Sequence, residues 1–287
     1  MFDLNVTLLK TQIAGWLQED IATGDISTIA TIPMDHQSKG ILHVKETGLV
    51  AGLPIVQLVC AEVDPELNVR TCVEEGALAV KGTIIAEISG RTHSILMAER
   101  LALNLLQRLS GIATKTRAFV EALDGLPVRL VDTRKTTPGL RALEKYAVRI
   151  GGGYNHRFGL YDAVMIKDNH IKASGGIVNA IRTARIRIPH TMKIEVEAEN
   201  MKQVEEALEA GADIIMLDNM NPSNMSVAVR RIREAASHIV IEASGGVSLE
   251  TVKSIALTGV DVISVGSLTH SIRSLDISLD LNERKES

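Results

Sequence analysis

The chain of 287 residues has few aromatic side chains and few cysteines: three Phe, three Tyr, one Trp and two Cys. A protein that holds single-stranded nucleic acid by stacking on its bases needs more aromatic rings than this. The net charge of −4 also disfavours a general binder of phosphate backbones. Cys60 and Cys72 are too few for a disulfide framework or a four-thiolate metal site, so we expect both to be packing residues.

Long apolar runs and the common nucleotide-binding loops are missing as well. The longest apolar stretch, Leu49 to Ala61, is too short to span a bilayer and is interrupted by Gly52 and Pro54. No N-terminal signal pattern is visible, and we therefore expect a reduced, cytoplasmic protein. Neither a GxGxxG nor a GxxxxGK(S/T) loop follows a first strand. With 45% hydrophobic and 23% charged residues, the composition is typical of a globular enzyme.

The first 110 residues have the pattern of a small α+β domain. Period-two alternation between glycines predicts an antiparallel sheet built from Gly40–Gly48, Leu67–Val73 and Gly82–Gly90. A helix follows, with an apolar residue at every fourth position: Met97, Leu101, Leu105 and Leu109. A polar stripe runs beside it, formed by Arg100, Asn104 and Arg108. The spacing alone favours a solvated helix face for this stripe.

After residue 110, apolar strand-like runs end in polar clusters, and each is followed by a helical pattern. From Lys167 onward the strand ends recur about every 25 residues, one β–α unit each. Six such units predict an open, incomplete parallel α/β barrel, with a doubly wound sheet as the alternative. Catalytic groups of such barrels cluster at the carboxyl ends of the strands. Here those ends carry Arg134, Lys135, Lys167, Glu195, Asp218, Ser244 and Gly266.

Positive charge is concentrated in one part of the predicted barrel. Between Asp132 and Lys172 there are eight Lys and Arg against four Asp and Glu, a net charge of +4. Arginine side chains bind planar carboxylates with two parallel hydrogen bonds, so this segment predicts an anionic small-molecule ligand. A solvated basic helix is the alternative, and it fits only Arg141, Lys145 and Arg149, which are spaced by four.

Two glycine-containing strand ends have the pattern of phosphate-binding turns. Ser244–Gly246 and Gly266–Ser267 each follow a strand and precede a predicted helix, where backbone N–H groups can approach an anion. Tight turns are the alternative for either pair alone. The strand-end acids Glu195 and Asp218 are suited to Mg²⁺ or to sugar hydroxyls. Lys167 leaves a second chemistry open, because a lysine at the end of a barrel strand can form a Schiff base.

Several motifs resemble those of the quinolinate phosphoribosyltransferase family, the carboxylating nicotinate-nucleotide pyrophosphorylases, which are type II phosphoribosyltransferases. The motifs are Asp132–Arg141, Gly151–Arg157, Ile166–His170, Glu99–Asn104, Leu109–Thr114, Glu195–Glu197, Glu242–Gly246 and Thr269–Asp276. The likeness covers nearly the whole chain. A minor departure is Leu101, where the family often has Thr.

The resemblance implies a fold, a reaction and an assembly. The expected fold is an α+β sandwich over residues 1–110, rejoined by the tail 271–287, and an open α/β barrel over residues 111–270. Such enzymes join quinolinate to phosphoribosyl pyrophosphate and release pyrophosphate and carbon dioxide, leaving nicotinate mononucleotide, a precursor of NAD. The expected cofactor is Mg²⁺. The expected assembly is a homodimer with shared active sites, with a larger oligomer left open, and no nucleic acid or membrane is involved.

The resemblance also implies site residues. Those expected to clamp the two quinolinate carboxylates are Arg134, His156, Arg157 and Lys167, with Arg100 supplied by the neighbouring subunit. Lys135 is expected to bind the pyrophosphate, and Glu195 and Asp218 the ribose hydroxyls and Mg²⁺. Those expected to hold the 5′-phosphate are Ser244, Gly245, Gly246, Val265, Gly266 and Ser267, and Thr133 completes the substrate-binding set. The expected catalytic residues are Lys135, Lys167, Glu195 and Asp218.

Three alternative functions stay open on the sequence. A phosphoribosyltransferase that acts on nicotinate or another carboxylate without decarboxylation would share the phosphate-binding turns but need fewer cations. An aldolase would use Lys167 as its Schiff-base lysine. A non-catalytic sensor of phosphorylated metabolites would bind its ligand without consuming it.

Overall fold

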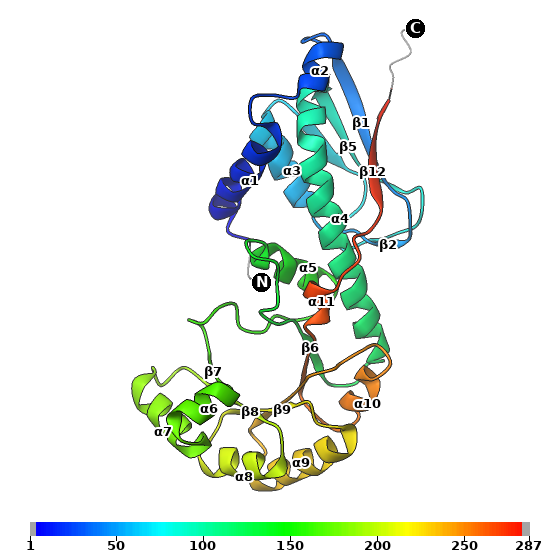
Figure 1. Ribbon diagram of the computed structural model, residues 1–287. Coiled ribbons are helices and arrows are strands. Elements are labelled where there is room, and N and C mark those ends of the chain that lie inside the picture. Colours follow the sequence, from blue (N-terminus) through cyan, green and yellow to red (C-terminus); the bar gives the residue numbers. More distant parts are fainter. Residues whose placement is uncertain (1–3, 283–287) are drawn as a thin grey trace. The chain divides into compact units, whose positions relative to one another are not determined.

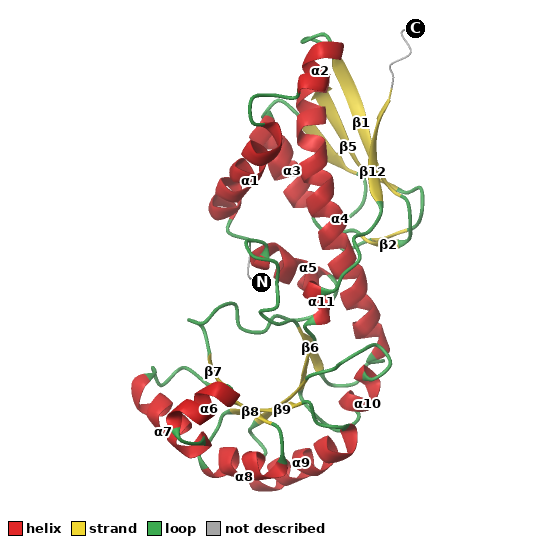
Figure 2. Cartoon of the chain, viewed as in Figure 1, coloured by secondary structure: helices red, strands yellow, loops and turns green. Residues whose placement is uncertain are grey.

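The computed structural model describes residues 4–282, and the chain divides into two compact units (Figures 1 and 2). The first unit comprises Met1–Lys115, Ala142–Gly151 and Ile272–Ser287, and the second comprises Thr116–Arg141 and Gly152–Ser271. The short segment Ala142–Gly151 therefore belongs with the first unit, a feature that the sequence patterns do not reveal. Among the described residues, none of the helices combines the length and the apolar character that crossing a membrane requires.

The first unit is an antiparallel sheet with helices. Its helices are α1 (Val6–Ile21), α2 (Ile26–Thr31), α3 (Leu53–Val63), most of α4 (Thr92–Ala122) and α5 (Arg141–Ile150). Its strands are β1 (Gln37–Val44), β2 (Gly48–Leu49), β3 (Asn68–Thr71), β4 (Leu78–Ala79), β5 (Ile84–Arg91) and β12 (Ile277–Asn282). The main sheet has the order β12-β1-β5-β3, so that the C-terminal strand pairs with β1, and β2 pairs with β4.

Local sequence signals explain where several of these elements begin and how closely they pack. The side chains of Asn5 and Asp25 each accept a backbone N–H at the start of α1 and α2, as N-cap residues do. Gly40 in β1 lets the sheet approach α4, because a Cβ there would lie 3.3 Å from Ile95. The predicted antiparallel sheet and the helix that follows it are both confirmed.

The solvated-helix interpretation holds for the exposed Arg149 of α5 but is wrong for Lys145 and for part of the polar stripe on α4. Glu144 and Lys145 of α5 are buried, at 0% and 1% exposed. Arg108 from the stripe donates to Glu144 through Nε and Nη2, at 2.9 and 2.6 Å. A buried carboxylate needs such charge-assisted partners. Arg100 and Asn104 of the same stripe are exposed, as the prediction had it.

The second unit is an open parallel α/β barrel. Its strands are β6 (Arg129–Val131), β7 (Val164–Ile166), β8 (Ile194–Ala198), β9 (Ile214–Asp218), β10 (Val240–Ser244) and β11 (Val262–Ser264). Its helices are α6 (Asp168–Ser174), α7 (Ile177–Arg187), α8 (Met201–Glu209), α9 (Pro222–Ala235), α10 (Val252–Ala256) and α11 (Ser267–His270). The six parallel strands have the order β6-β11-β10-β9-β8-β7. In residues 4–282 no ladder joins the edge strands β6 and β7, so the barrel is open, as predicted.

Side-chain alternation along the strands divides the barrel wall into two faces. Val196, Ile215 and Ile241 are in register across β8, β9 and β10, and each is 0% exposed. They lie on the outer side, which helices α7 to α9 cover (Figure 1). One residue further along each strand, the side chains point to the opposite face of the sheet. In this row, Glu197 and Glu242 flank Met216 in the same register. Because successive residues of a strand point to opposite faces, this alternation puts acids inside the barrel.

The opposite ends of the strands are fixed by a repeated Arg–Asp contact. The Asp213 carboxylate accepts the Ile194 N–H at 2.7 Å and pairs with Arg185 at 2.8 Å. The Asp261 carboxylate accepts the Ile241 N–H at 2.7 Å and pairs with Arg233. In each case the aspartate follows a helix, and its carboxylate accepts a backbone N–H at the start of the neighbouring strand. These contacts stabilise the end of the barrel away from the polar strand ends.

Candidate active site

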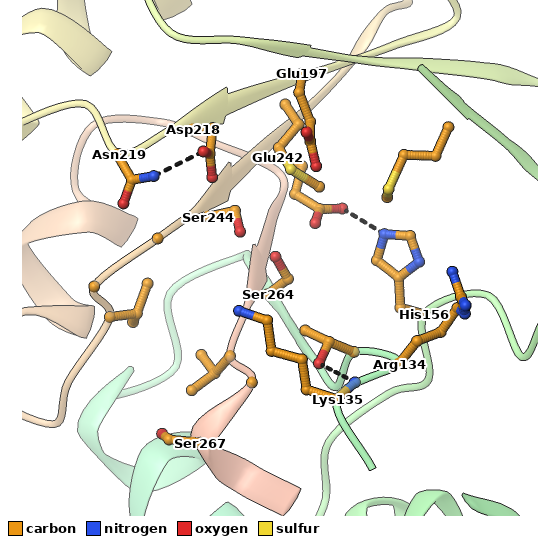
Figure 3. A pocket seen from close by; sticks show the side chains of 18 of the residues that line it. Arg134, Lys135, His156, Glu197, Asp218, Asn219, Glu242, Ser244, Ser264 and Ser267 are labelled. Carbon is orange, nitrogen blue, oxygen red and sulfur yellow. Dashed lines mark hydrogen bonds and ion pairs between the residues drawn. The ribbon is translucent and has the colours of Figure 1, made fainter. Parts of the chain in front are cut away.

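The loop after β6 is fixed by short hydrogen bonds at the carboxyl end of the strand. Thr133 Oγ1 accepts the Lys135 N–H at 3.0 Å, and the buried hydroxyl of Thr269 donates to the Lys135 carbonyl at 2.8 Å. The loop is thereby tied to α11. Arg134 and Lys135 leave this loop in different directions, Arg134 toward His156 and Lys135 toward Ser244 and Ser264 (Figure 3).

The segment that carries His156 and Arg157 runs along β6. The Tyr154 N–H donates to the Leu130 carbonyl at 2.8 Å, and the Asp132 N–H donates to the Tyr154 carbonyl at 3.2 Å. Asp132 is fully buried, and its carboxylate accepts the His156 N–H at 2.9 Å. Two motifs that are twenty residues apart in the chain thus lie side by side.

A pocket of about 680 Å³ opens over these strand ends (Figure 3). Of the residues predicted from the sequence, those lining it are Thr133, Arg134, Lys135, His156, Arg157, Lys167, Asp218, Ser244, Gly245, Gly246, Val265, Gly266 and Ser267. Most come from the ends of β9 and β10, from the start of α11 or from the loops after β6, β7, β10 and β11, whereas His156 and Arg157 lie on the segment between α5 and β7. The expectation that these residue types would meet at one edge of the barrel is therefore met in the structure.

Two predicted residues do not line this pocket. Glu195 is buried at 3% exposed, and Glu197, two residues further along β8, lines the pocket instead. Arg100 lies on α4 in the first unit, with its side chain 59% exposed. There it borders a smaller hollow between Asp20, Asp25 and Met97. Its predicted role across a subunit interface stays a prediction.

The cations of the pocket are poorly neutralised by the protein. Within residues 4–282, Arg134, Lys135 and Arg157 form no ion pair, and the buried Nε of Arg134 has no hydrogen-bond partner. Arg157 instead donates to the Ala163 carbonyl and to the Met165 sulfur, at 3.1 and 3.5 Å. Burial and the nearby charge of Arg134 lower the pKa of Arg157. Cations that repel one another and lack partners create a site for a ligand with more than one negative charge.

Lys167 differs from the other pocket cations because it is already paired. Its ammonium lies 2.5 Å from Oε1 of Glu197. Lys167 follows β7 directly, and its backbone N–H donates to Nδ1 of His170 at 3.0 Å. Glu197 comes from the inner face of β8, which pairs with β7.

His156 is held by two buried acids. Its Nε2 lies 3.4 Å from the carboxylates of both Glu195 and Glu242. Burial disfavours the charged ring, but hydrogen bonds and charges of these acids outweigh it and raise the pKa of His156 to about 10. The backbone nitrogen of Arg157 lies 2.7 Å from Nδ1, so Nε2 is the nitrogen that faces the two acids. Burial and the charge of Glu242 raise the pKa of Glu195.

These three residues are close enough together to surround a cation, but the geometry disfavours one. The raised pKa of His156 keeps a proton on Nε2, which occupies the lone pair that a metal would need. The buried Oε1 atoms of Glu195 and Glu242 have no partner in the described chain. We interpret the cluster as a support that orients His156 toward the pocket.

The two glycine-containing turns let neighbouring groups approach the backbone closely. Gly245 has φ +90°, and a Cβ there would lie 2.2 Å from Oδ1 of Asn219. Gly266 needs no special backbone angle, but a Cβ would meet Lys135 and His270 at 3.0 and 3.2 Å. At both turns, the side chain of a larger residue would press against residues that line the pocket. These backbone segments face the same part of the pocket as the Lys135 ammonium (Figure 3).

Asn219 holds Asp218 in place. Its side-chain amide donates to Asp218 Oδ2 at 2.7 Å, and its N–H donates to the Ser244 carbonyl at 2.9 Å. Asn219 has φ +54°, a left-handed conformation that few residues other than glycine adopt, although Asn tolerates it better than most. A strained residue next to a pocket carboxylate is typical of a functional position.

Sequence reasoning missed Glu197, Asn219, Glu242, Ser264 and His270, which all line the pocket. Period-two alternation gave a usable signal for Glu197 and Glu242, because both face the same side as Met216. Ser264 is the last residue of β11 and Asn219 directly follows β9, so both are polar residues at strand ends, whereas His270 ends α11 and has no such signal.

Comparison with known proteins identifies the family. The family model described as "Quinolinate phosphoribosyl transferase, N-terminal domain" matches residues 25–110, and the corresponding C-terminal domain model matches residues 112–280. The chain belongs to the quinolinate phosphoribosyltransferase family. The resemblance stated from the motifs is confirmed, and membership sets aside the aldolase and sensor alternatives.

Relatives of this phosphoribosyltransferase chain match it over nearly its whole length. The probable nicotinate-nucleotide pyrophosphorylase (carboxylating) of Synechocystis sp. is 47% identical over 266 residues, covering 93% of this chain and 90% of the relative. The quinolinate phosphoribosyltransferase (decarboxylating) 1b of Nicotiana tabacum is 44% identical, covering 96% and 82%. The crystal structure of NadC from Streptococcus pyogenes has 43% identity and a TM-score of 0.92, covering 99% and 100%. The predicted fold class is confirmed by this structural likeness.

Proposed function

We propose that this chain transfers the phosphoribosyl group of phosphoribosyl pyrophosphate to quinolinate, with loss of carbon dioxide. The products are nicotinate mononucleotide and pyrophosphate, which makes the enzyme a pentosyltransferase of de novo NAD biosynthesis. One observation carries the proposal: Arg134 and Arg157, which have no ion-pair partner among residues 4–282, lie in the same pocket as the glycine turns at Gly245 and Gly266. The names and the 44–47% identity of the curated relatives support it.

The cationic part of the pocket fits a pyridine with two adjacent carboxylates. Arg134, Arg157 and Lys167 supply three positive charges, and His156 lines the same pocket. Two carboxylates relieve the repulsion between the guanidinium groups, and the forked geometry of arginine orients the ring. Nicotinate, with one carboxylate, would leave part of this charge unmatched.

The other part of the pocket fits the sugar phosphate. The backbone at Ser244–Gly246 and Val265–Ser267 is the proposed cradle of the 5′-phosphate, and Lys135 the proposed partner of the pyrophosphate. Glu197 and Asp218 are the proposed partners of the ribose hydroxyls. Glu197 takes the role that the sequence suggested for Glu195, because Glu195 is buried against His156 and does not line the pocket.

Mg²⁺ is part of the proposal, because the donor set facing the pocket is suitable for it. Glu197 and Asp218 present carboxylate oxygens, which are hard ligands of the kind that Mg²⁺ prefers. When bound, Mg²⁺ would neutralise part of the pyrophosphate charge.

The chain's own groups supply binding, orientation and charge. The clamp on the two carboxylates holds the ring nitrogen in line with the anomeric carbon, and the new N–C bond forms as the C–O bond to pyrophosphate breaks. Lys135 stabilises the negative charge that develops on the leaving group, so positioning and electrostatics carry most of the acceleration. The C2–carboxylate bond then breaks, and its electron pair stays beside the positive ring nitrogen until a proton replaces the carboxylate. That step requires no separate cofactor.

A cytoplasmic homodimer with shared sites is the proposed assembly, with Arg100 of one subunit completing the clamp of the other. The exposure of Arg100 in the single chain supports this role. Mixing an inactive Arg100→Ala variant with an inactive Lys167→Ala variant tests it, because each mixed dimer then contains one intact site. Recovered activity in verified mixed dimers is the expected result, and no recovery would contradict the sharing.

The reaction itself is tested by incubating the enzyme with quinolinate, phosphoribosyl pyrophosphate and Mg²⁺. We expect nicotinate mononucleotide and carbon dioxide in equal amounts. Nicotinate in place of quinolinate separates this function from the non-decarboxylating alternative, and we expect nicotinate to be a poor substrate. Equal rates with nicotinate, or product without carbon dioxide, would refute the assignment.

A further inference from the structure

The Lys167–Glu197 ion pair joins two groups that the proposed function gives to different substrates. Lys167 belongs to the clamp for the dicarboxylate, and Glu197 faces the sugar and its metal. In the structure each is the other's partner, at 2.5 Å. While this pair is intact, one of the three donors of the ammonium and one oxygen of Glu197 are committed to each other.

The strands and helices of the barrel hold the two residues of this ion pair close together. Glu197 is fixed by its strand and only 16% exposed, and β7 and β8 are hydrogen-bonded neighbours. Lys167 is held at the start of α6 by the bond from its N–H to His170. Its side chain is 44% exposed, so the ammonium has room to turn toward a ligand.

Elsewhere in the pocket, the one further ion pair of the described residues joins His156 to Glu242 and involves no sugar-side acid. Arg134, Lys135 and Arg157 form no ion pair within residues 4–282. Asp218, the other acid proposed for the sugar side, takes its hydrogen bond from Asn219 and not from a cation. The Lys167–Glu197 contact therefore directly connects a clamp cation with a sugar-side acid.

We propose that this ion pair couples the binding of the two substrates. The inference rests on the proposed function and deepens it. A dicarboxylate that engages Lys167 alone must draw it away from Glu197, which leaves that carboxylate without its partner. Sugar hydroxyls or Mg²⁺ that engage Glu197 release Lys167. Each substrate thus removes part of the cost of binding the other, and the effect is the same in both directions because binding free energies are linked.

The test needs a dicarboxylate that binds without reacting. Phthalate has two adjacent carboxylates on a six-membered ring but no ring nitrogen, so it cannot attack the sugar. Calorimetric titration gives its dissociation constant with and without saturating phosphoribosyl pyrophosphate and Mg²⁺. The ratio of these two constants is the coupling factor. Two anions in one pocket also repel, so the decisive quantity is how far a variant changes this factor from the wild-type value.

Glu197→Gln breaks the ion pair and keeps the side chain's shape. We expect phthalate alone to bind this variant about fivefold or more tightly than wild type, and the coupling factor to fall by a similar amount, at the lower end of ordinary coupling energies. Asp218→Asn is the matched control, since it removes the same charge from the same pocket. We expect a smaller change in phthalate affinity from it. In a Lys167→Met background, Glu197→Gln should no longer tighten phthalate binding.

Equal effects of Glu197→Gln and Asp218→Asn on phthalate affinity would overturn the proposal, because simple charge repulsion would then explain both. An unchanged coupling factor in Glu197→Gln would overturn it too. Thermal unfolding of each variant checks that the fold is retained. Failure of the proposed function is a separate result: the wild-type enzyme would then neither bind phthalate or quinolinate nor form nicotinate mononucleotide.

Discussion

Arg134→Met separates the contribution of a pocket cation to binding from its contribution to stability. The substitution keeps most of the aliphatic stem but removes the charge and the hydrogen-bond donors. In the described chain the guanidinium has no ion pair, and its buried Nε has no partner. The folded protein therefore loses no ion pair, and Arg157 loses a repelling neighbour. We expect stability within about 0.5 kcal/mol of wild type, as for substitutions that break no special contact.

Quinolinate affinity should respond much more strongly. Removing one partner of a buried, hydrogen-bonded charge pair costs about 2–5 kcal/mol. Three cations of the pocket, Arg134, Arg157 and Lys167, share two carboxylates, so the remaining two partly compensate and the lower end applies. A loss of about 2–3 kcal/mol corresponds to a dissociation constant raised roughly 30- to 150-fold.

The assay is calorimetric titration of quinolinate without phosphoribosyl pyrophosphate, together with urea unfolding. Arg129→Met is the matched control, because Arg129 begins β6 and its exposed guanidinium lies over the Tyr154 ring at 5.6 Å. It should lose about 0.5–1 kcal/mol of stability and keep its quinolinate affinity. If Arg134→Met binds quinolinate within twofold of wild type, or if both variants lose affinity equally, Arg134 is not part of the clamp.

Three further predictions concern the turns, the first unit and the thiols. Gly245→Ala should destabilise the protein by about 2–3 kcal/mol, because its Cβ would collide with Asn219. Gly246→Ala should cost about 1 kcal/mol, because Gly246 has φ +61° but open space around it. Equal costs of the two variants in urea unfolding would contradict this. The Ser94 hydroxyl, with help from Arg91, holds the pKa of the buried Asp64 below its ordinary value. The stabilisation is therefore present at neutral pH and is lost as the pH falls through the folded-state pKa. Asp64→Asn should therefore cost about 2 kcal/mol at pH 7 and progressively less below about pH 4, and a pH-independent difference in unfolding free energy would refute the assignment. Burial raises the pKa of the Cys60 thiol to about 12, whereas Cys72 is exposed. One thiol should therefore react with a maleimide in the native protein, and two after unfolding. Two fast-reacting thiols in the native protein would contradict the burial of Cys60.

The sequence was sufficient to predict which strand ends meet. Parallel strands place their carboxyl ends at one edge, so Arg134, Lys167, Asp218 and Ser244 had to lie near one another once six β–α units were recognised. The order of the strands follows from the same repeat, because consecutive units lie side by side from β7 to β11. The antiparallel sheet of the first unit was predictable from alternation between glycines.

What lies beneath the pocket was not predictable from spacing. Glu195 and Glu197 have the same parity on β8 and both face the barrel interior, and only the position of His156 decides that Glu195 is buried against it. The burial of Lys145 had the same origin. A helix whose cations recur every fourth residue looks solvated, but α5 packs as part of the first unit, where Arg108 needs Glu144. Such tertiary partners are far apart in the chain and leave no local pattern.

The charge pattern of the barrel interior explains why binding and stability oppose each other at this site. Alternation puts acids on the inner face of β8 and β10, and each buried acid there finds a partner: Glu195 and Glu242 take His156, and Glu197 takes Lys167. Arg134 and Arg157, on the loops around the pocket, have no acidic partner in the part of the chain that the structure describes. A carboxylate opposite them would stabilise the folded chain, but it would also compete with the two carboxylates of the substrate. Without such a competing carboxylate, both arginines are available to bind the ligand. Their mutual repulsion destabilises the folded chain, and the packed strands and their Arg–Asp contacts offset that cost.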